Sequence, residues 1–209
     1  KILRKDMEIR LLYSQINPHF LYNTLGMIIN EAEKEGAENT TELIELLSGM
    51  FRYNLQKEQY LVPLKKEIEY IQSYLLLLKK RYGEGFTAIF ELDHTLDEYP
   101  VPHIFLQPLI ENCIVHGSCA GQEKLDIIIR TLQTETEKLI IIKNTGNILS
   151  REQVKELNDM VQREFEVGKQ ERVKTLQNIN FRLKTACSGQ CGLNFEFDEN
   201  YVVLKIRIG

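Results

Sequence analysis

The chain has 209 residues, of which 43% are hydrophobic and 27% are charged, and its formal net charge is −4. This length can bury one large core or two smaller ones, and the composition is ordinary for a globular protein. Binding to nucleic-acid phosphates needs a basic face, so the acidic balance gives no support for a nucleic-acid partner. No run of about 18 apolar residues is present, so no segment of the sequence is expected to cross a membrane.

The first 82 residues predict helices. Residues 1–15 begin abruptly in charged, helix-like sequence without a signal-peptide pattern, which indicates a piece of a longer protein. Apolar residues recur at steps of three to five from Leu43 onward, and a second such stripe follows Pro63. The polar stretch 33–41 separates the first two helices, with Gly36 as their stop. We therefore expect residues 1–82 to form three helices, the first two as a hairpin.

The pattern changes after Gly83 and Gly85. Residues 86–92 alternate between apolar and polar positions, which predicts a strand, and a proline-punctuated loop at 99–102 leads into a helix that ends at Gly117. Residues 125–132 and 138–144 predict paired strands, residues 150–161 and about 172–186 predict helices, and a hairpin ends the chain. The expected class is α+β: residues 83–209 should form an antiparallel-dominated sheet with helices on one face.

The four cysteines do not predict a metal site. Cys187 and Cys191 have C-x3-C spacing, but no second Cys/His pair follows at zinc-finger spacing. Cys113 and Cys119 stand apart from them. We expect all four to be reduced thiols.

The segment Asn17-Pro18-His19 is the first candidate for chemistry. Asn17, His19 and Asn23 bring polar groups together near one face of the first helix. An imidazole has an unperturbed pKa of about 6.5, so at neutral pH it is mostly uncharged and carries a nucleophilic nitrogen. Such a histidine can attack a phosphoryl group, although a surface or capping histidine without a role would also account for the spacing.

A second polar group lies inside the apolar helix that ends at Gly117. Glu111, Asn112 and His116 interrupt that helix, with Asn112 and His116 one turn apart. Carboxylate or amide oxygens at such positions can hold Mg²⁺, which binds oxygen ligands and bridges phosphates. A polar stripe that merely faces water would give the same spacing. His94 and His103 lie outside both segments and are assigned no function.

Two long motifs carry a resemblance to a known family. The segment INPHFLYNTL at residues 16–25 resembles the phosphoacceptor box of LytS/YehU-type sensor histidine kinases, and LQPLIENCIVHG at 106–117 resembles their N-box. The similarity runs from about Leu11 to Gly117 in the right order. By this resemblance, the C-terminal part has the Bergerat ATP-binding fold, a two-layer α/β sandwich shared with gyrase, Hsp90 and MutL.

The resemblance implies a site made of several parts. His19 would accept the γ-phosphoryl group of ATP, with Asn17 and Asn23 around it, and Glu111 would activate or position the reacting group. Asn112 would ligate Mg²⁺. The nucleotide would also be bound by His116, Gly117, Asn144, Gly146, Lys174 and Asn178.

The glycine boxes depart from the family pattern. Asn144 stands where the family has an aspartate that accepts a hydrogen bond from adenine. Loss of the negative charge is expected to weaken the free energy of nucleotide binding by about 1–2 kcal/mol. In the run 173–183, Leu176, Asn178 and Arg182 match the second box. Both of its glycines are replaced, one of them by Val173, while Lys174 adds positive charge.

The leading hypothesis is the kinase region of a two-component sensor: ATP- and Mg²⁺-dependent phosphorylation of His19, then transfer to an aspartate of a response regulator. The resemblance implies a homodimer through the N-terminal helices and a cytoplasmic location, with membrane spans upstream in a bacterial inner or plasma membrane protein. The degenerate boxes favour an alternative, a pseudokinase-like binding and relay module. A gyrase- or Hsp90-like ATPase would leave the NPHFLYN segment unexplained.

Overall fold

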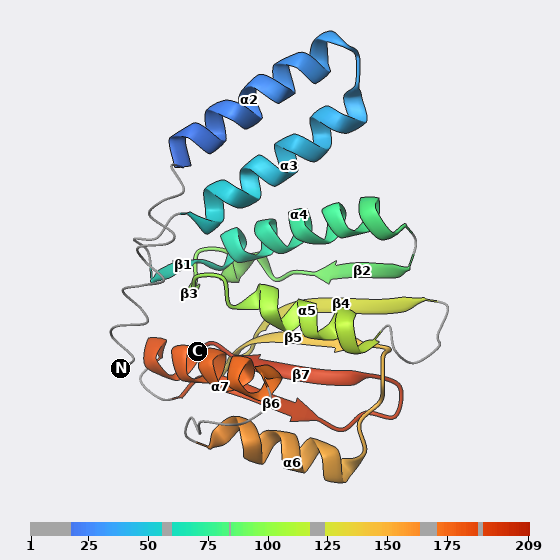
Figure 1. Cartoon of the computed structure of the whole chain (residues 1–209). Coiled ribbons are helices and arrows are strands. Elements are labelled where there is room, and N and C mark those ends of the chain that lie inside the picture. The colour runs from blue at the N-terminus through green and yellow to red at the C-terminus, as the bar shows by residue number, and fades with distance from the viewer. Residues whose placement is uncertain (1–17, 56–59, 84, 118–123, 164–170, 188–189) are drawn as a thin grey trace. The chain divides into compact units, whose positions relative to one another are not determined.

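The chain forms two compact units, Lys1–Lys57 and Glu58–Gly209, in a computed structural model that describes residues 18–55, 60–83, 85–117, 124–163, 171–187 and 190–209 (Figure 1). The α+β class expected from the sequence is confirmed. The contacts divide the chain earlier than the predicted boundary at residue 82. The third N-terminal helix, α4 (Leu64–Tyr82), therefore belongs to the unit that contains the sheet.

The first unit contains an antiparallel helical hairpin of α2 (Pro18–Lys34) and α3 (Glu38–Asn54). Gly36 has a φ of 68°, which favours glycine, and the Ala37 amide donates to the Ala32 carbonyl at 2.8 Å across the turn. Leu25 and Ala32 are buried on α2. The predicted hairpin and its stop at Gly36 are confirmed.

The second unit is built around a mixed five-stranded sheet. Its spatial order is β2 (Phe86–Glu91), β4 (Leu125–Gln133), β5 (Lys138–Asn144), β7 (Val202–Arg207) and β6 (Gly192–Glu196). Only β2 and β4 pair in parallel, and the other pairs are antiparallel. The long central strands are rich in β-branched residues, which suit a buried pleated surface.

Helices cover one face of this sheet: α4, α5 (Leu106–Gly117), α6 (Arg151–Gln162) and α7 (Glu171–Ala186) (Figure 1). Alternate residues of β4 are buried, as expected when one face meets the helices. The opposite face carries a smaller apolar cluster around Leu139, Ile141 and Val203. The main core between sheet and helices holds the completely buried side chains Ile71, Phe105, Ile110, Ile127, Ile140, Leu183 and Ile206.

The start of α5 is fixed by a distant carboxylate. Glu67 of α4 is fully buried and accepts backbone hydrogen bonds from Ile104 at 2.6 Å, Phe105 at 3.1 Å and Leu106 at 3.3 Å. The first amides of a helix have no partner within it, and a carboxylate there is also favoured by the helix dipole. Pro108 lies in this first turn, where its missing N–H removes no helical hydrogen bond.

Two short elements were not predicted. The proline-punctuated segment forms β3 (Pro100–Pro102), which pairs with β1 (Leu61–Pro63) in a separate two-stranded ribbon. A 3₁₀ helix, η1 (His94–Leu96), lies between β2 and β3. Proline cannot donate to a ladder, so a two-stranded ribbon tolerates it better than a central strand would.

One cysteine expectation is wrong. Cys187, just after α7, and Cys191, just before β6, form a disulfide, whereas reduced thiols were expected. The Cα atoms of the two cysteines lie 5.6 Å apart, which the C-x3-C spacing alone did not show. Cys119 lies outside the described residues. Among the helices of the described ranges, none is long and apolar enough to cross a membrane.

Candidate functional site

A pocket of about 120 Å³ opens between the sheet and the helices of the second unit. Its walls combine apolar side chains with three asparagines. The lining residues are Leu109, Asn112, Cys113, Ile142, Asn144, Asn147, Leu149, Leu176, Phe195, Val202 and Leu204. Residues from α5, β5, α7, β6 and β7 thus meet at one place, and two of the predicted site residues, Asn112 and Asn144, are among them.

Asn112 is half-buried on the face of α5 that lines the pocket. Its side-chain nitrogen donates to the Pro108 carbonyl, one turn earlier, at 2.8 Å. This hydrogen bond uses the amide N–H and leaves the carbonyl oxygen as the group that can bind a ligand. An oxygen in this position suits a hard cation.

Asn144 is the last residue of β5 and is 5% exposed. The turn that follows is tied to the start of β4, since Thr145 and Asp126 exchange two hydrogen bonds, at 3.0 Å and 3.1 Å. Gly146 is buried in this turn, outside the pocket lining. The turn therefore fixes the place at which Asn144 enters the pocket.

Glu111 lies on α5 beside Asn112 but does not line the pocket. Gln107 donates to the Glu111 carboxylate at 2.7 Å, and the Tyr70 hydroxyl of α4 donates to Gln107 at 2.7 Å. The carboxylate is held half-buried by this relay, which fixes its orientation.

The second glycine-box region is helical. Val173 is buried in α7 and Leu176 lines the pocket. Lys174 is half-buried and Asn178 is exposed, and both lie outside the pocket lining. Neither of the two site residues predicted on α7 therefore lines the pocket, whereas Leu176, which matches the family motif, does.

Side-chain amides on α6 and α7 join these helices to the edge strand β6. Asn180 donates to the Val161 carbonyl at 3.0 Å and accepts from the Leu193 amide at 2.9 Å. Asn158 forms a similar pair of bonds with Phe195, at 2.8 Å and 2.7 Å. These bonds fix the wall of the pocket formed by α7 and Phe195.

His19 lies on the exposed surface of α2, in the first turn of the helix. The Asn23 side-chain nitrogen is 3.2 Å from its Nδ1, one turn further along. Asn23 therefore lies beside His19. Asn17 lies outside the described residues. His116 and Gly117 end α5, and their surroundings are likewise outside the description.

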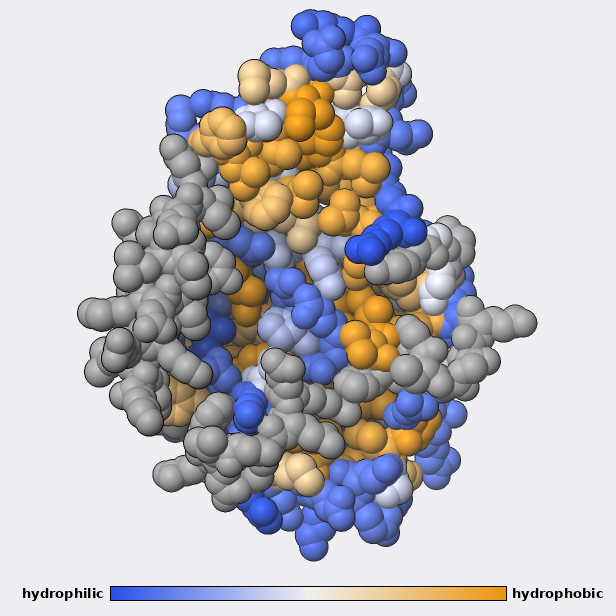
Figure 2. Space-filling model, in the orientation of Figure 1, coloured by the Kyte–Doolittle hydropathy of each residue, from blue (hydrophilic) through white to orange (hydrophobic). Residues whose placement is uncertain are grey.

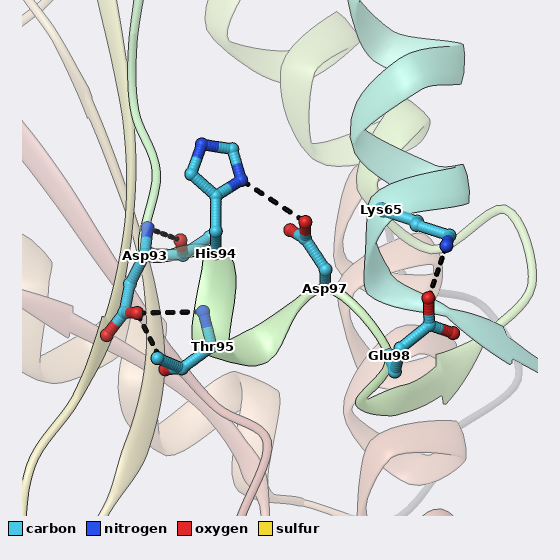
Figure 3. Close-up of polar contacts among 7 residues, drawn as sticks. Lys65, Asp93, His94, Thr95, Asp97 and Glu98 are labelled. Atoms are coloured by element: carbon cyan, nitrogen blue, oxygen red, sulfur yellow. Dashed lines mark hydrogen bonds and ion pairs between the residues drawn. The ribbon is translucent and has the colours of Figure 1, made fainter.

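The connector between β2 and β3 holds the polar contacts of Figure 3. The Asp93 carboxylate accepts from the Thr95 hydroxyl at 2.6 Å and from the Thr95 amide at 3.0 Å, and these bonds hold the pKa of Asp93 below its usual value. Lys65 pairs with Glu98, which raises the pKa of Lys65. His94 contacts Asp97 at 3.2 Å on the surface.

Several pocket residues were missed by sequence reasoning. Phe195, Val202 and Leu204 come from the last hairpin, where nothing in the alternating pattern distinguishes them from core residues. Asn147 had a local signal, because it lies three positions after Asn144 in the run KNTGN. The apolar residues had none, because pocket and core use the same side chains.

Comparisons with known proteins agree with this geometry. A family profile described as histidine kinase matches residues 7–86. The sensor histidine kinase/phosphatase LytS of Staphylococcus aureus strain Mu50 is 31% identical over 197 residues, which cover 93% of this chain and 33% of the relative. LytS of strain N315 matches equally. The chain thus spans about a third of the length of the curated relatives it matches.

Two solved structures share the fold. The histidine kinase domain of a blue-light activated histidine kinase from Erythrobacter litoralis has a TM-score of 0.50 at 11% identity, covering 87% of this chain and 84% of its own. The nucleotide-free catalytic domain of histidine kinase ThkA also has a TM-score of 0.50, at 18% identity, covering 71% and 93%. At these identities the likeness concerns the fold alone.

The hairpin with an exposed histidine, the sheet-and-helix unit and these matches together define a protein of the histidine kinase family. Within that family, the chain is similar over 93% of its length to the sensor histidine kinase/phosphatase LytS.

Proposed function

We propose that the chain is the kinase region of a two-component sensor, which uses ATP to phosphorylate His19 and then passes the phosphoryl group to an aspartate of a response regulator. The observation that carries the proposal is the convergence of Asn112 and Asn144, from two separate motifs, in one pocket. An exposed histidine with an orienting neighbour supplies the acceptor.

The pocket fits the base of a nucleotide. It is concave, mostly apolar and has a few polar groups, which is the usual character of a site for a planar heterocycle. Apolar side chains of α5, α7 and β7 would contact the ring faces. Asn144, at its buried end, would hydrogen-bond the edge of the base. The phosphates would extend toward Asn112, Lys174 and the end of α5.

Magnesium is proposed to be held by few protein groups. Within the described ranges, no three His, Cys, Asp or Glu side chains cluster as a metal site. Mg²⁺ is commonly bound through one or two side chains together with substrate phosphates and waters. The Asn112 oxygen, left available by the bond to Pro108, is the proposed ligand.

His19 would act as the nucleophile through a ring nitrogen with a lone pair. A carboxamide at position 23 can support either tautomer, because its N–H donates to an unprotonated Nδ1 and its oxygen accepts from a protonated one. With Nδ1 protonated, the lone pair of Nε2 would form the N–P bond while the bond from the γ-phosphorus to the bridging oxygen breaks and ADP leaves. We propose that Glu111 positions or activates the reacting group, and that Asn17 lies near His19.

Incubation of the 209-residue chain with γ-labelled ATP and Mg²⁺ tests the proposal. We expect acid-labile label on the wild type, none on His19→Gln, and strongly reduced label on Asn112→Ala. A matched control is Asn30→Ala, on the exposed surface of α2 away from His19, which should label normally. Absence of acid-labile label on the wild type, under conditions where ADP binds, would reject phosphorylation of His19.

A second function is favoured by one observation, the helical course of α7 through Val173, where the family has a glycine. A chain that keeps the fold but binds no nucleotide would transmit signals through changes in its conformation. Calorimetry with ADP separates the two functions: micromolar binding supports the kinase, and no binding supports the relay.

We propose a homodimer formed through the hairpin. Phe20, Met27 and Ile28 of α2 are 69%, 64% and 45% exposed, and apolar surface covers much of the hairpin face in Figure 2. Spacing of seven and eight residues places them on one side of the helix, as in a helix-bundle seam. Sedimentation should show a dimer that Met27→Lys weakens, whereas Gln72→Lys, exposed on α4, should leave it intact.

The remaining parts of the proposal concern the whole protein. We propose that the kinase region is cytoplasmic and that sensing and membrane-spanning segments lie upstream of it in the full-length bacterial protein. Phosphotransfer to purified candidate regulators, measured as movement of the label from His19, tests the partner.

A further inference from the structure

Among the described residues, no charged side chain lines the pocket. Within the described residues, its only polar side chains are Asn112, Asn144 and Asn147, and the rest of the wall is apolar apart from Cys113. Recognition of a ligand edge therefore depends on neutral hydrogen-bonding groups. No fixed charge favours one pattern of donors and acceptors on the ligand over another.

Asn144 is the buried member of these three. It is 5% exposed, it lines the pocket, and its side chain makes no hydrogen bond to any other described residue. Because this amide opens onto the pocket, a ligand there can take the place of water as its hydrogen-bond partner. Its amide is thus a recognition group whose partner is expected to be the ligand.

A carboxamide carries a donor and an acceptor side by side. The edge of adenine presents an amino donor beside a ring-nitrogen acceptor, and the edge of guanine presents a carbonyl acceptor beside a ring N–H donor. Rotating the Asn144 amide by half a turn exchanges its donor and acceptor and so matches either purine. A carboxylate at the same position would accept from adenine but repel the guanine carbonyl oxygen.

We infer that this pocket binds guanine as well as adenine nucleotides, and that Asn144 is the residue that makes it permissive. The inference rests on the proposed nucleotide-binding function and adds the substrate class of the same site. It also assigns Asn144 a role in base specificity, because Asn144 is buried at the end of β5 and lines the cavity.

Calorimetric titration of the 209-residue chain with ADP and GDP, each with Mg²⁺, tests this inference without turnover. We expect the two dissociation constants of the wild type to agree within about ten-fold, because each base satisfies both groups of the amide. Asn144→Asp should raise the dissociation constant of GDP by about ten- to a hundred-fold, while the dissociation constant of ADP should change by no more than about a few-fold. The matched control, Asn194→Asp, makes the same change on the exposed side of β6, outside the pocket, and should alter neither.

Each outcome decides one point. ADP binding with GDP more than about a hundred-fold weaker would overturn the inference and leave the kinase proposal standing. Binding of both nucleotides with no selective change in Asn144→Asp would overturn the assignment to Asn144. Failure of both nucleotides to bind would reject the inference together with the ATP-dependent function. Circular dichroism of each variant confirms that it is folded.

Discussion

The buried carboxylate of Glu67, on α4, accepts the backbone N–H of Phe105 at 3.1 Å, 38 residues further along the chain. It accepts the amides of Ile104 and Leu106 as well, so it caps the helix that carries Glu111 and Asn112. The position of α5 over the sheet, and with it one wall of the pocket, thus depends on α4.

Replacing Glu67 by Gln should therefore loosen the start of α5. The amide nitrogen of Gln would face backbone N–H groups, and leaving one of them unpaired costs about 1–3 kcal/mol. We expect a lower urea midpoint and weaker ADP binding. Glu69→Gln, on the exposed side of the same helix, is the matched control. Equal behaviour of the two variants would show that the cap does not hold the helix.

The His19–Asn23 contact predicts a role for Asn23 in the transfer step. Asn23→Ala removes the group that orients the imidazole, and loss of one such hydrogen bond corresponds to about a ten-fold lower rate of labelling. The affinity for ADP should be unchanged, because the nucleotide pocket is left intact. Asn30→Ala should keep the normal rate. A fall in ADP affinity in Asn23→Ala would contradict this assignment.

Asp93 should contribute stability that disappears in acid. Hydrogen bonds from the Thr95 hydroxyl, the Thr95 amide and the Gln133 amide lower the pKa of Asp93 in the folded chain. The contribution is then complete above the ordinary carboxyl pKa of about 4 and is lost as the pH falls through the lower, folded-state pKa.

The measurement is the urea midpoint of wild type and Asp93→Asn between neutral pH and about pH 3. We expect the wild type to have the higher urea midpoint at neutral pH. The difference in midpoint between the wild type and Asp93→Asn should become smaller as the pH falls. The same substitution at Asp159, exposed on α6, is the control. A gap for Asp93→Asn that stays constant with pH would exclude the effect.

Gly192 should not tolerate a side chain. Its φ is 156°, and a Cβ built there would lie 2.8 Å from Oδ1 of Asn180, the side chain that joins α6 to β6. Gly192→Ala should cost about 1–3 kcal/mol through this clash. Gly49, exposed on α3 with no atom near the added Cβ, should instead gain about 0.5–1 kcal/mol as Ala. Native-state hydrogen exchange measures the two changes in stability separately, that of Gly192→Ala at the amides of β6 and that of Gly49→Ala at the amides of α3.

The sequence anticipated the elements that depend on neighbouring residues. The α2–α3 hairpin and the β4–β5 and β6–β7 pairs follow from the local periodicity of the sequence. The parallel pairing of β2 with β4, the ribbon of β1 with β3 and the disulfide joining Cys187 to Cys191 were not anticipated.

By itself, the sequence determined the family and the two polar segments around His19 and Asn112, because each motif is contiguous and carries its own chemistry. Only the tertiary structure decided which residues share a cavity: it brought Asn144 to Asn112, left Lys174 and Asn178 outside the lining, and placed α4 with the sheet through Glu67. The physical reason is that a pocket is made by packing and hydrogen bonds between residues far apart in the chain, which no local pattern records.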